Sequence, residues 1–221
     1  MKRINWHRIV RVLLLLNMLF FFLLNSIYFM VNSSKPDGYI AATAAIFGAA
    51  GAYFNIRYYE LAYLFSSIIY SYISFNYYLV GEGFANLFIC GIAHIVLFVN
   101  NIRHKEKPSI HMDGKKSTLY STFMAIFSII GVAMLYRLLV LFRSTFADWE
   151  SASIVLLCWA FYFEIKNKQM QWFFWLFRNA ISLYIWFFIN DRSHIEMMWL
   201  FHFIQSILCV LEYASLKIDN E

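Results

Sequence analysis

The chain has 221 residues, of which 62% are hydrophobic and 14% charged, and its mean hydropathy is +0.59. A soluble domain carries about 25% charged residues and cannot bury this much apolar surface. Composition therefore excludes a soluble protein and indicates an integral membrane protein. The formal net charge of +5 does not indicate a nucleic-acid partner, because the basic residues gather at the ends of apolar segments, where they orient membrane spans.

Eight apolar segments follow one another along the chain, most of them near the roughly 17–25 residues that a bilayer requires. They cover approximately residues 12–31, 38–56, 59–79, 83–101, 118–142, 151–166, 172–190 and 195–214. The first is too long for the core of a signal peptide and lacks a following small-x-small cleavage site, so we interpret it as a mature helix. The sequence thus predicts an all-α integral membrane protein with eight transmembrane helices.

The positions of Lys and Arg predict the orientation of these helices. With the N-terminus inside, thirteen of the 18 Lys and Arg residues fall in inner segments, whereas outer segments hold only Lys35, Arg143 and Arg192. Cytoplasmic segments carry the excess of positive charge, so we expect both termini to be cytoplasmic. Arg137 and Arg178 lie inside spans, and we expect each to extend toward the nearer membrane face.

Acidic residues stand near the ends of several spans. Glu60, Glu164 and Glu212 are each close to a predicted helix end, and we expect their carboxylates to be solvated. A proton-coupled transporter would require a carboxylate in the middle of a span. The sequence therefore favours uncoupled transport over coupling to protons.

A polar, basic loop at residues 102–117 separates two halves with a similar rhythm. Three pairs of residues, each 114 positions apart, occupy matching places in the halves: Tyr58 and Trp172, Tyr70 and Tyr184, and Glu82 and Glu196. These matches predict two three-helix bundles joined by the fifth span, a parallel 3+1+3 repeat. We divide the chain accordingly into an N-terminal cytoplasmic end and extra transmembrane helix (1–37), a first three-helix bundle (38–101), a basic cytoplasmic loop and linker helix (102–150), and a second three-helix bundle with a cytoplasmic C-terminus (151–221).

The seventh apolar segment carries one polar and aromatic face. The residues at intervals of 3, 4, 3 and 4 share one stripe of an α-helix, namely Trp172, Trp175, Asn179, Ser182 and Trp186. An indole face beside a cationic ring contributes roughly 0.5–2 kcal/mol, and an asparagine offers two donors and an acceptor to an amide or hydroxyl. We interpret this stripe of residues 171–186 as half of a binding site for a flat, polar ring that is uncharged or cationic.

Each of these residues also has a purely structural interpretation. Tryptophans near the ends of a span form interfacial belts, which is an even alternative for Trp172 and the favoured one for Trp186. An asparagine in a membrane helix joins neighbouring helices. The same alternative holds for Gln205, three residues after His202 in the last span, which we include among the candidates to line the site with Asn179.

The pattern Trp172-x-x-Trp175-x-x-x-Asn179 resembles the signature of the Pnu family of vitamin and nucleoside transporters. The family pattern continues into Leu183-Tyr184, which adds Tyr184 to the candidate substrate-binding residues. The resemblance covers about residues 38–214. It implies a SWEET-like fold, a homotrimer in a bacterial inner membrane, and facilitated diffusion of nicotinamide riboside, an NAD precursor that phosphorylation then traps inside the cell.

Two further stretches bear on this resemblance. Gly81-Glu82 followed by Asn86 is similar to a motif in the first half of the family. By contrast, the glycine-tryptophan ending of the family's fourth helix is absent, and Arg178 beside the motif asparagine departs from the family pattern. These departures bear on the choice of substrate more than on the fold.

Three other functions remain open from the sequence. The first is transport of a related vitamin or nucleoside, such as thiamine, riboflavin or a deoxynucleoside; the second is an accessory subunit without a ligand of its own. The third is a membrane-embedded enzyme, for which only His104, His111 and Asp113 in the basic loop are candidates. We expect no catalytic residue, cofactor or metal site, because the three cysteines lie in separate spans and no catalytic motif occurs.

Overall fold

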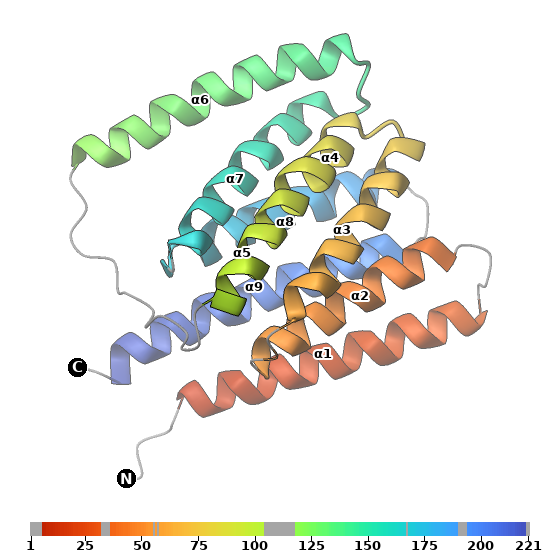
Figure 1. Cartoon of the computed structure of the whole chain (residues 1–221), viewed down its shortest axis with the longest axis vertical. Coiled ribbons are helices and arrows are strands. Elements are labelled where there is room, and N and C mark those ends of the chain that lie inside the picture. Colours follow the sequence, from red (N-terminus) through yellow and green to blue (C-terminus); the bar gives the residue numbers. More distant parts are fainter. Residues whose placement is uncertain are drawn as a thin grey trace.

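The computed structural model describes residues 6–31, 36–54, 56, 58–103, 118–166, 168–189 and 194–219. The candidate residues His104, His111 and Asp113 lie outside these ranges. The helices are α1 (Trp6–Val31), α2 (Pro36–Tyr53), α3 (Tyr59–Asn76), α4 (Val80–Phe84), the π-helical turn η1 (Ala85–Cys90), α5 (Gly91–Arg103), α6 (Thr118–Leu141), α7 (Ala147–Ile165), α8 (Gln171–Ile189) and α9 (His194–Asp219). Since α4, η1 and α5 follow one another without a break, the described ranges form eight helical rods, each near a predicted span (Figure 1).

Five of the helical stretches are long and apolar enough to cross a membrane. These are residues Trp6–Val31, Val80–Ile102, Thr122–Leu141, Gln171–Ile189 and His194–Ser215. The other three rods, α2, α3 and α7, are 18 or 19 residues long and bury many small or polar side chains instead. The protein is thus an all-helical membrane protein, and the crossing of the membrane by all eight rods stays a prediction.

The rods lie side by side, and after the first helix α1 three of them precede the linking helix α6 and three follow it (Figure 1). Both ends of the chain lie at the same end of the bundle. Helix α6 lies on one flank and packs against α7, where the indole N–H of Trp159 donates to the hydroxyl of Ser128 at 2.8 Å. The order of helices therefore agrees with a 3+1+3 arrangement after an extra first helix.

The two halves meet in an apolar core built from α2 and α3 of the first half and α8 and α9 of the second. Small side chains of α2 let the helices approach closely, and aromatic side chains fill the space between them. The buried members of this core are Ala41, Ala42, Ala45, Tyr70, Ile73, Leu79, Ile185, Trp186, Ile195, Met198 and Trp199. The core brings residues more than 100 positions apart in the sequence into one layer.

Helix α1 is fastened to the bundle near both of its ends. Near its start, the side chains of His7 and Arg11 lie 3.4 and 3.5 Å from the carboxylate of Glu212 in α9. Near its other end, the Asn25 carbonyl oxygen lies 2.5 Å from Nδ1 of His194, and the Asn25 amide donates to the Thr43 hydroxyl at 3.0 Å. The extra helix is therefore an integral part of the bundle.

The sixth span begins four residues earlier than predicted, at Ala147 instead of residue 151. Asp148 and Glu150 both lie in the first turn of α7. Acidic residues stabilise a helix N-terminus, and Glu150 is fully buried. Its Oε1 accepts a hydrogen bond from the backbone N–H of Glu82 at 2.9 Å. Glu150 therefore provides an acceptor for a backbone N–H in the first turn of α4.

Two of the three residue pairs that suggested the repeat do not share environments. Tyr70 is buried in the core at 1% exposure, whereas Tyr184 is 40% exposed. Glu82 is likewise 1% exposed, whereas Glu196 is only partly buried. These positions therefore do not carry equivalent side chains, and the correspondence between the two halves stays a prediction.

Candidate functional site

Helix α8 turns the polar part of its stripe into the bundle. Asn179 is 4% exposed, and Ser182 and Trp186 are completely buried, whereas Trp172 and Trp175 nearer the helix start are partly exposed. The expectation that Trp186 belongs to an interfacial belt is wrong. Its indole N–H donates to the Tyr70 hydroxyl at 2.6 Å, inside the core that joins the two halves.

Asn179 connects α8 to α9. Its amide nitrogen donates to the backbone carbonyl of His202 at 3.2 Å and to the hydroxyl of Ser206 at 2.8 Å. The predicted neighbour Gln205 lies in the same turn of α9, near the side chains of Tyr63 and His202. The structure thus places Asn179 and Gln205 in one layer of the bundle, and Asn179 makes the interhelical hydrogen bonds that its structural interpretation predicts.

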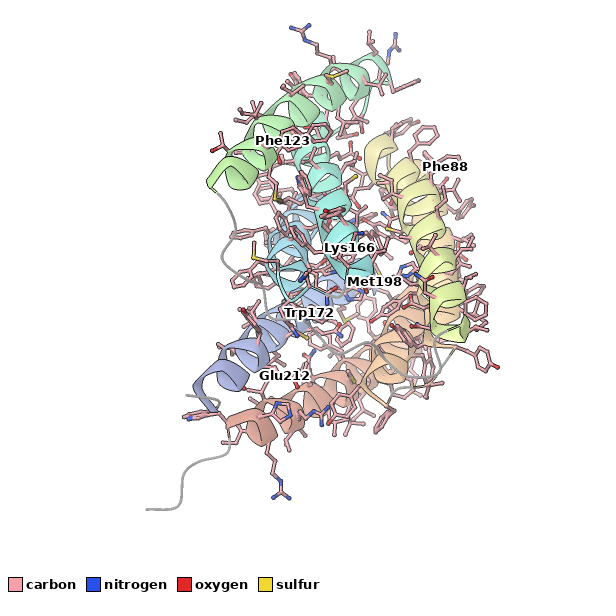
Figure 2. All side chains as sticks on the ribbon, turned by 60° about the vertical axis from the view of Figure 1, so that its left-hand side comes forward. Phe88, Phe123, Lys166, Trp172, Met198 and Glu212 are labelled. Atoms are coloured by element: carbon pink, nitrogen blue, oxygen red, sulfur yellow. The ribbon has the colours of Figure 1, made fainter. Side chains whose placement is uncertain are left out.

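The two motif tryptophans occupy different surroundings near the start of α8. The indole N–H of Trp175 donates to Glu164 at 3.3 Å, and its ring stands edge-on to Phe161 at 5.1 Å. Trp172 packs against an apolar cluster formed by α1 and α9 (Figure 2), which contains Val10, Leu14, Leu208 and Cys209. Only Trp175 therefore contacts the polar interior.

Tyr184 lies on a different side of α8 from the stripe. Its ring contacts Trp149 of α7 at 4.7 Å and Phe188 at 4.6 Å, and the side chain is 40% exposed. At 3.6 residues per turn, a residue five positions after Asn179 points well away from it. The structure therefore does not bring Tyr184 together with the other candidate residues.

A polar centre that the sequence did not predict lies around Glu82, which is 1% exposed. Its carboxylate accepts hydrogen bonds from five side chains of α3, η1, α7 and α8: Tyr70 at 3.3 Å, Asn86 at 3.2 Å, Ser153 at 2.6 Å, Arg178 at 3.2 Å and Ser182 at 3.3 Å. A carboxylate offers about four lone-pair positions, so Glu82 has no free acceptor capacity. It ties both halves of the protein together.

Arg178 does not extend to the membrane face, and that expectation is wrong. The side chain is 2% exposed, its terminal nitrogen lies 3.2 Å from Glu82, and its guanidinium carbon lies 4.1 Å from the centre of the Trp199 ring. A buried carboxylate 96 residues earlier in the chain provides the counter-charge that periodicity along one helix does not show. An arginine inside an apolar span is itself a signal of such a buried partner.

The expectation of a solvated carboxylate is also wrong for Glu60. Glu60 is 1% exposed, and its Oε2 lies 2.8 Å from Nδ1 of His94 in α5. The ring of Tyr63 stacks on His94 at 5.4 Å with an angle of 12° between the planes. Glu60 lies in the first turn of α3, but α5 covers this helix start and provides His94 as a polar partner. Ionisable groups therefore do lie in the interior, at helix starts that other helices cover.

The interior between the halves thus combines flat rings with hydrogen-bonding groups. Tyr63 and His94 come from the first half, and Trp175, Trp199 and His202 come from the second. Such an arrangement suits the binding of a planar, polar small molecule, for which pockets combine aromatic walls with a few precise polar groups. Among the described residues, no group of three or more His, Cys, Asp and Glu side chains is placed to hold a metal ion.

Two comparisons with known proteins agree with this description. A family model described as "Nicotinamide mononucleotide transporter" matches residues 38–216, which is all of the chain except α1 and the extreme C-terminus. The fold is similar to that of a protein reported as "Crystal structure of the Vitamin B3 transporter PnuC", with a TM-score of 0.72, 18% sequence identity and 90% of each chain covered. A search of curated proteins found no match.

Proposed function

The chain belongs to the nicotinamide mononucleotide transporter family, and from this membership we propose that it carries nicotinamide riboside across a bacterial inner membrane. The protein is a multi-pass membrane protein of a transporter family and not an enzyme. The proposed transport is facilitated diffusion, after which phosphorylation inside the cell traps the riboside for NAD synthesis.

The observation that carries this proposal is that the polar and aromatic stripe of α8 faces the interior between the two halves. Trp175 presents an indole to the polar interior, and Asn179 is an amide buried one turn away from it. An indole face attracts a cationic ring such as pyridinium, and an amide pairs with the polar edge of a nucleoside. Gln205 in the same layer of α9 adds a second amide, so we place the substrate between α8, α9 and the first half.

The charge of the interior favours the riboside over the mononucleotide that the family description names. Glu60, Glu82 and Glu150 are at most 1% exposed. Arg178 is the one Lys or Arg that is buried among the described residues, and it is already paired with Glu82. A phosphate brings about 1.5–2 negative charges into an interior where carboxyl groups outnumber cationic groups, whereas the riboside is a cation.

Transport by this fold requires the two halves to move relative to each other. In such proteins a site at the interface of two repeats opens alternately to either side. In the present structure the contacts Glu82–Arg178 and Tyr70–Trp186 join the two halves. We propose that these contacts close the outer side, with both termini cytoplasmic. The homotrimer stays a prediction.

A ligand screen on purified protein tests the proposed substrate. A ligand that binds only the folded state raises its stability by RT ln(1 + [L]/Kd), which is about 2.7 kcal/mol at a hundredfold excess over Kd. We expect nicotinamide riboside to raise the melting temperature, and nicotinamide mononucleotide, thiamine, riboflavin and thymidine to leave it unchanged. A shift with one of those four alone would identify a related carrier instead, and the absence of any shift would favour an accessory subunit without a ligand.

A further inference from the structure

Two hydrogen-bond donors in the interior have no acceptor among the residues that the structure describes. They are Nε of Arg178 and the indole nitrogen of Trp199. Both side chains are nearly inaccessible, at 2% and 4% exposure. Buried donors in folded proteins are nearly always paired, and leaving one unpaired costs stability. A donor pair of this kind therefore indicates a group that is bound there in function.

The side chains that carry the two donors lie next to each other in the bundle. The guanidinium carbon of Arg178 lies 4.1 Å from the centre of the Trp199 ring, so the groups are in direct contact. Arg178 precedes the motif residue Asn179, and Trp199 lies one turn before His202, whose backbone carbonyl binds Asn179 at 3.2 Å. The donors therefore lie between α8 and α9, beside the layer in which we place the substrate.

The charges around the donors indicate an uncharged acceptor. Arg178 is already paired with Glu82 at 3.2 Å, so the two side chains together carry no net charge. An anion bound to Arg178 would lie close to the Glu82 carboxylate without a second cation to balance it. An uncharged oxygen bears no such penalty.

The hydrogen bonds around the donors favour a carbonyl over a hydroxyl group. A hydroxyl group brings a proton that needs an acceptor of its own. The Glu82 carboxylate already accepts from five side chains, and the His202 carbonyl accepts from both Asn179 and Ser206. A carbonyl oxygen has two lone pairs and no proton, which matches two neighbouring donors that lack an acceptor.

We propose that Arg178 and Trp199 form a subsite that binds a carbonyl oxygen of the transported molecule. This inference rests on the proposed function, in which the matching group of nicotinamide riboside is its carboxamide oxygen. The subsite selects pyridine nucleosides that carry the carboxamide against those that lack it. Glu82 holds the Arg178 side chain in place for this role.

The test compares uptake of nicotinamide riboside with uptake of 1-ribosylpyridinium, which lacks only the carboxamide, in liposomes that contain the purified protein. The variant Trp199→Phe keeps an aromatic ring and removes the N–H donor. Losing one hydrogen bond to an uncharged group lowers the preference for the riboside by about two- to tenfold. The matched control is Trp159→Phe, whose N–H donates to Ser128 between α6 and α7, and we expect it to keep the preference of the unmodified protein.

A second variant guards against a folding defect in the first. Arg178→Lys keeps a positive charge beside Glu82 but removes Nε, and we expect the same loss of preference. An unchanged preference in Trp199→Phe, or in Arg178→Lys if the first variant does not fold, would overturn the subsite. Failure of the unmodified protein to take up either compound would instead overturn the proposed function, so the two failures are distinguishable.

Discussion

Replacing Asn179 with leucine is expected to lower the uptake of nicotinamide riboside into liposomes by at least about tenfold, because the substrate loses the amide that pairs with its polar edge. A site built on hydrogen bonds discriminates by this much or more when one partner is removed. Leucine keeps the branching of the side chain and its number of non-hydrogen atoms. The Ser206 hydroxyl still donates to the His202 carbonyl at 2.8 Å, so the variant leaves this carbonyl satisfied and should fold.

Ser206→Ala is the matched control for this prediction. It removes the 2.8 Å bond between Asn179 and α9 but leaves the amide of Asn179 in place. If Asn179 serves the substrate, Ser206→Ala retains uptake and melts only slightly lower than the unmodified protein. Equal loss of uptake in both variants would mean that Asn179 acts by joining the two helices, and full uptake by Asn179→Leu would remove it from the site.

Replacing Glu82 with glutamine is expected to destabilise the protein by about 3–5 kcal/mol, the usual cost of leaving a buried charge without its partner. Glutamine keeps the volume and one acceptor oxygen but leaves the Arg178 guanidinium, 2% exposed, without a counter-charge. The measurement is the melting temperature and the free energy of unfolding in detergent. The double variant Glu82→Gln/Arg178→Met removes the unpaired charge and should recover a large part of the loss.

Glu212→Gln is the control for this second prediction. Glu212 pairs with Arg11, whose side chain is 53% exposed, and an exposed ion pair contributes at most about 1 kcal/mol. We expect this variant to unfold almost like the original protein. A double variant at Glu82 and Arg178 that is no more stable than Glu82→Gln alone would show that the ion pair is not what stabilises the interior.

The fold followed from the sequence because each helix is marked by its own run of apolar residues. The predicted eight-helix arrangement, 3+1+3 after a first helix, agrees with the order of the described helices. The start of α7 was misplaced by four residues, and only the contact of Glu150 with the start of α4 explains a buried acid there. Whether a charged side chain in a helix is buried can be predicted from the sequence only when its partner on another helix is known.

The site was predictable to the extent that it lies on one helix. Periodicity placed Asn179 and Ser182 on the inward face of α8, and both are buried there. The surroundings of Arg178, Trp186 and Glu60 were not predictable, because each depends on a side chain from another helix. The sequence signal that would have helped is the pairing of an arginine in one apolar span with an acidic residue in another.

Uptake of labelled nicotinamide riboside by liposomes is the most direct test of the central claim, that this protein carries the riboside passively. We expect liposomes with the protein to accumulate label until the inner and outer concentrations are equal, with the same result in the presence and absence of a proton gradient. Excess unlabelled riboside should compete, and nicotinamide mononucleotide should not. Equal label in protein-containing and empty liposomes, or accumulation above the outer concentration, would contradict the account.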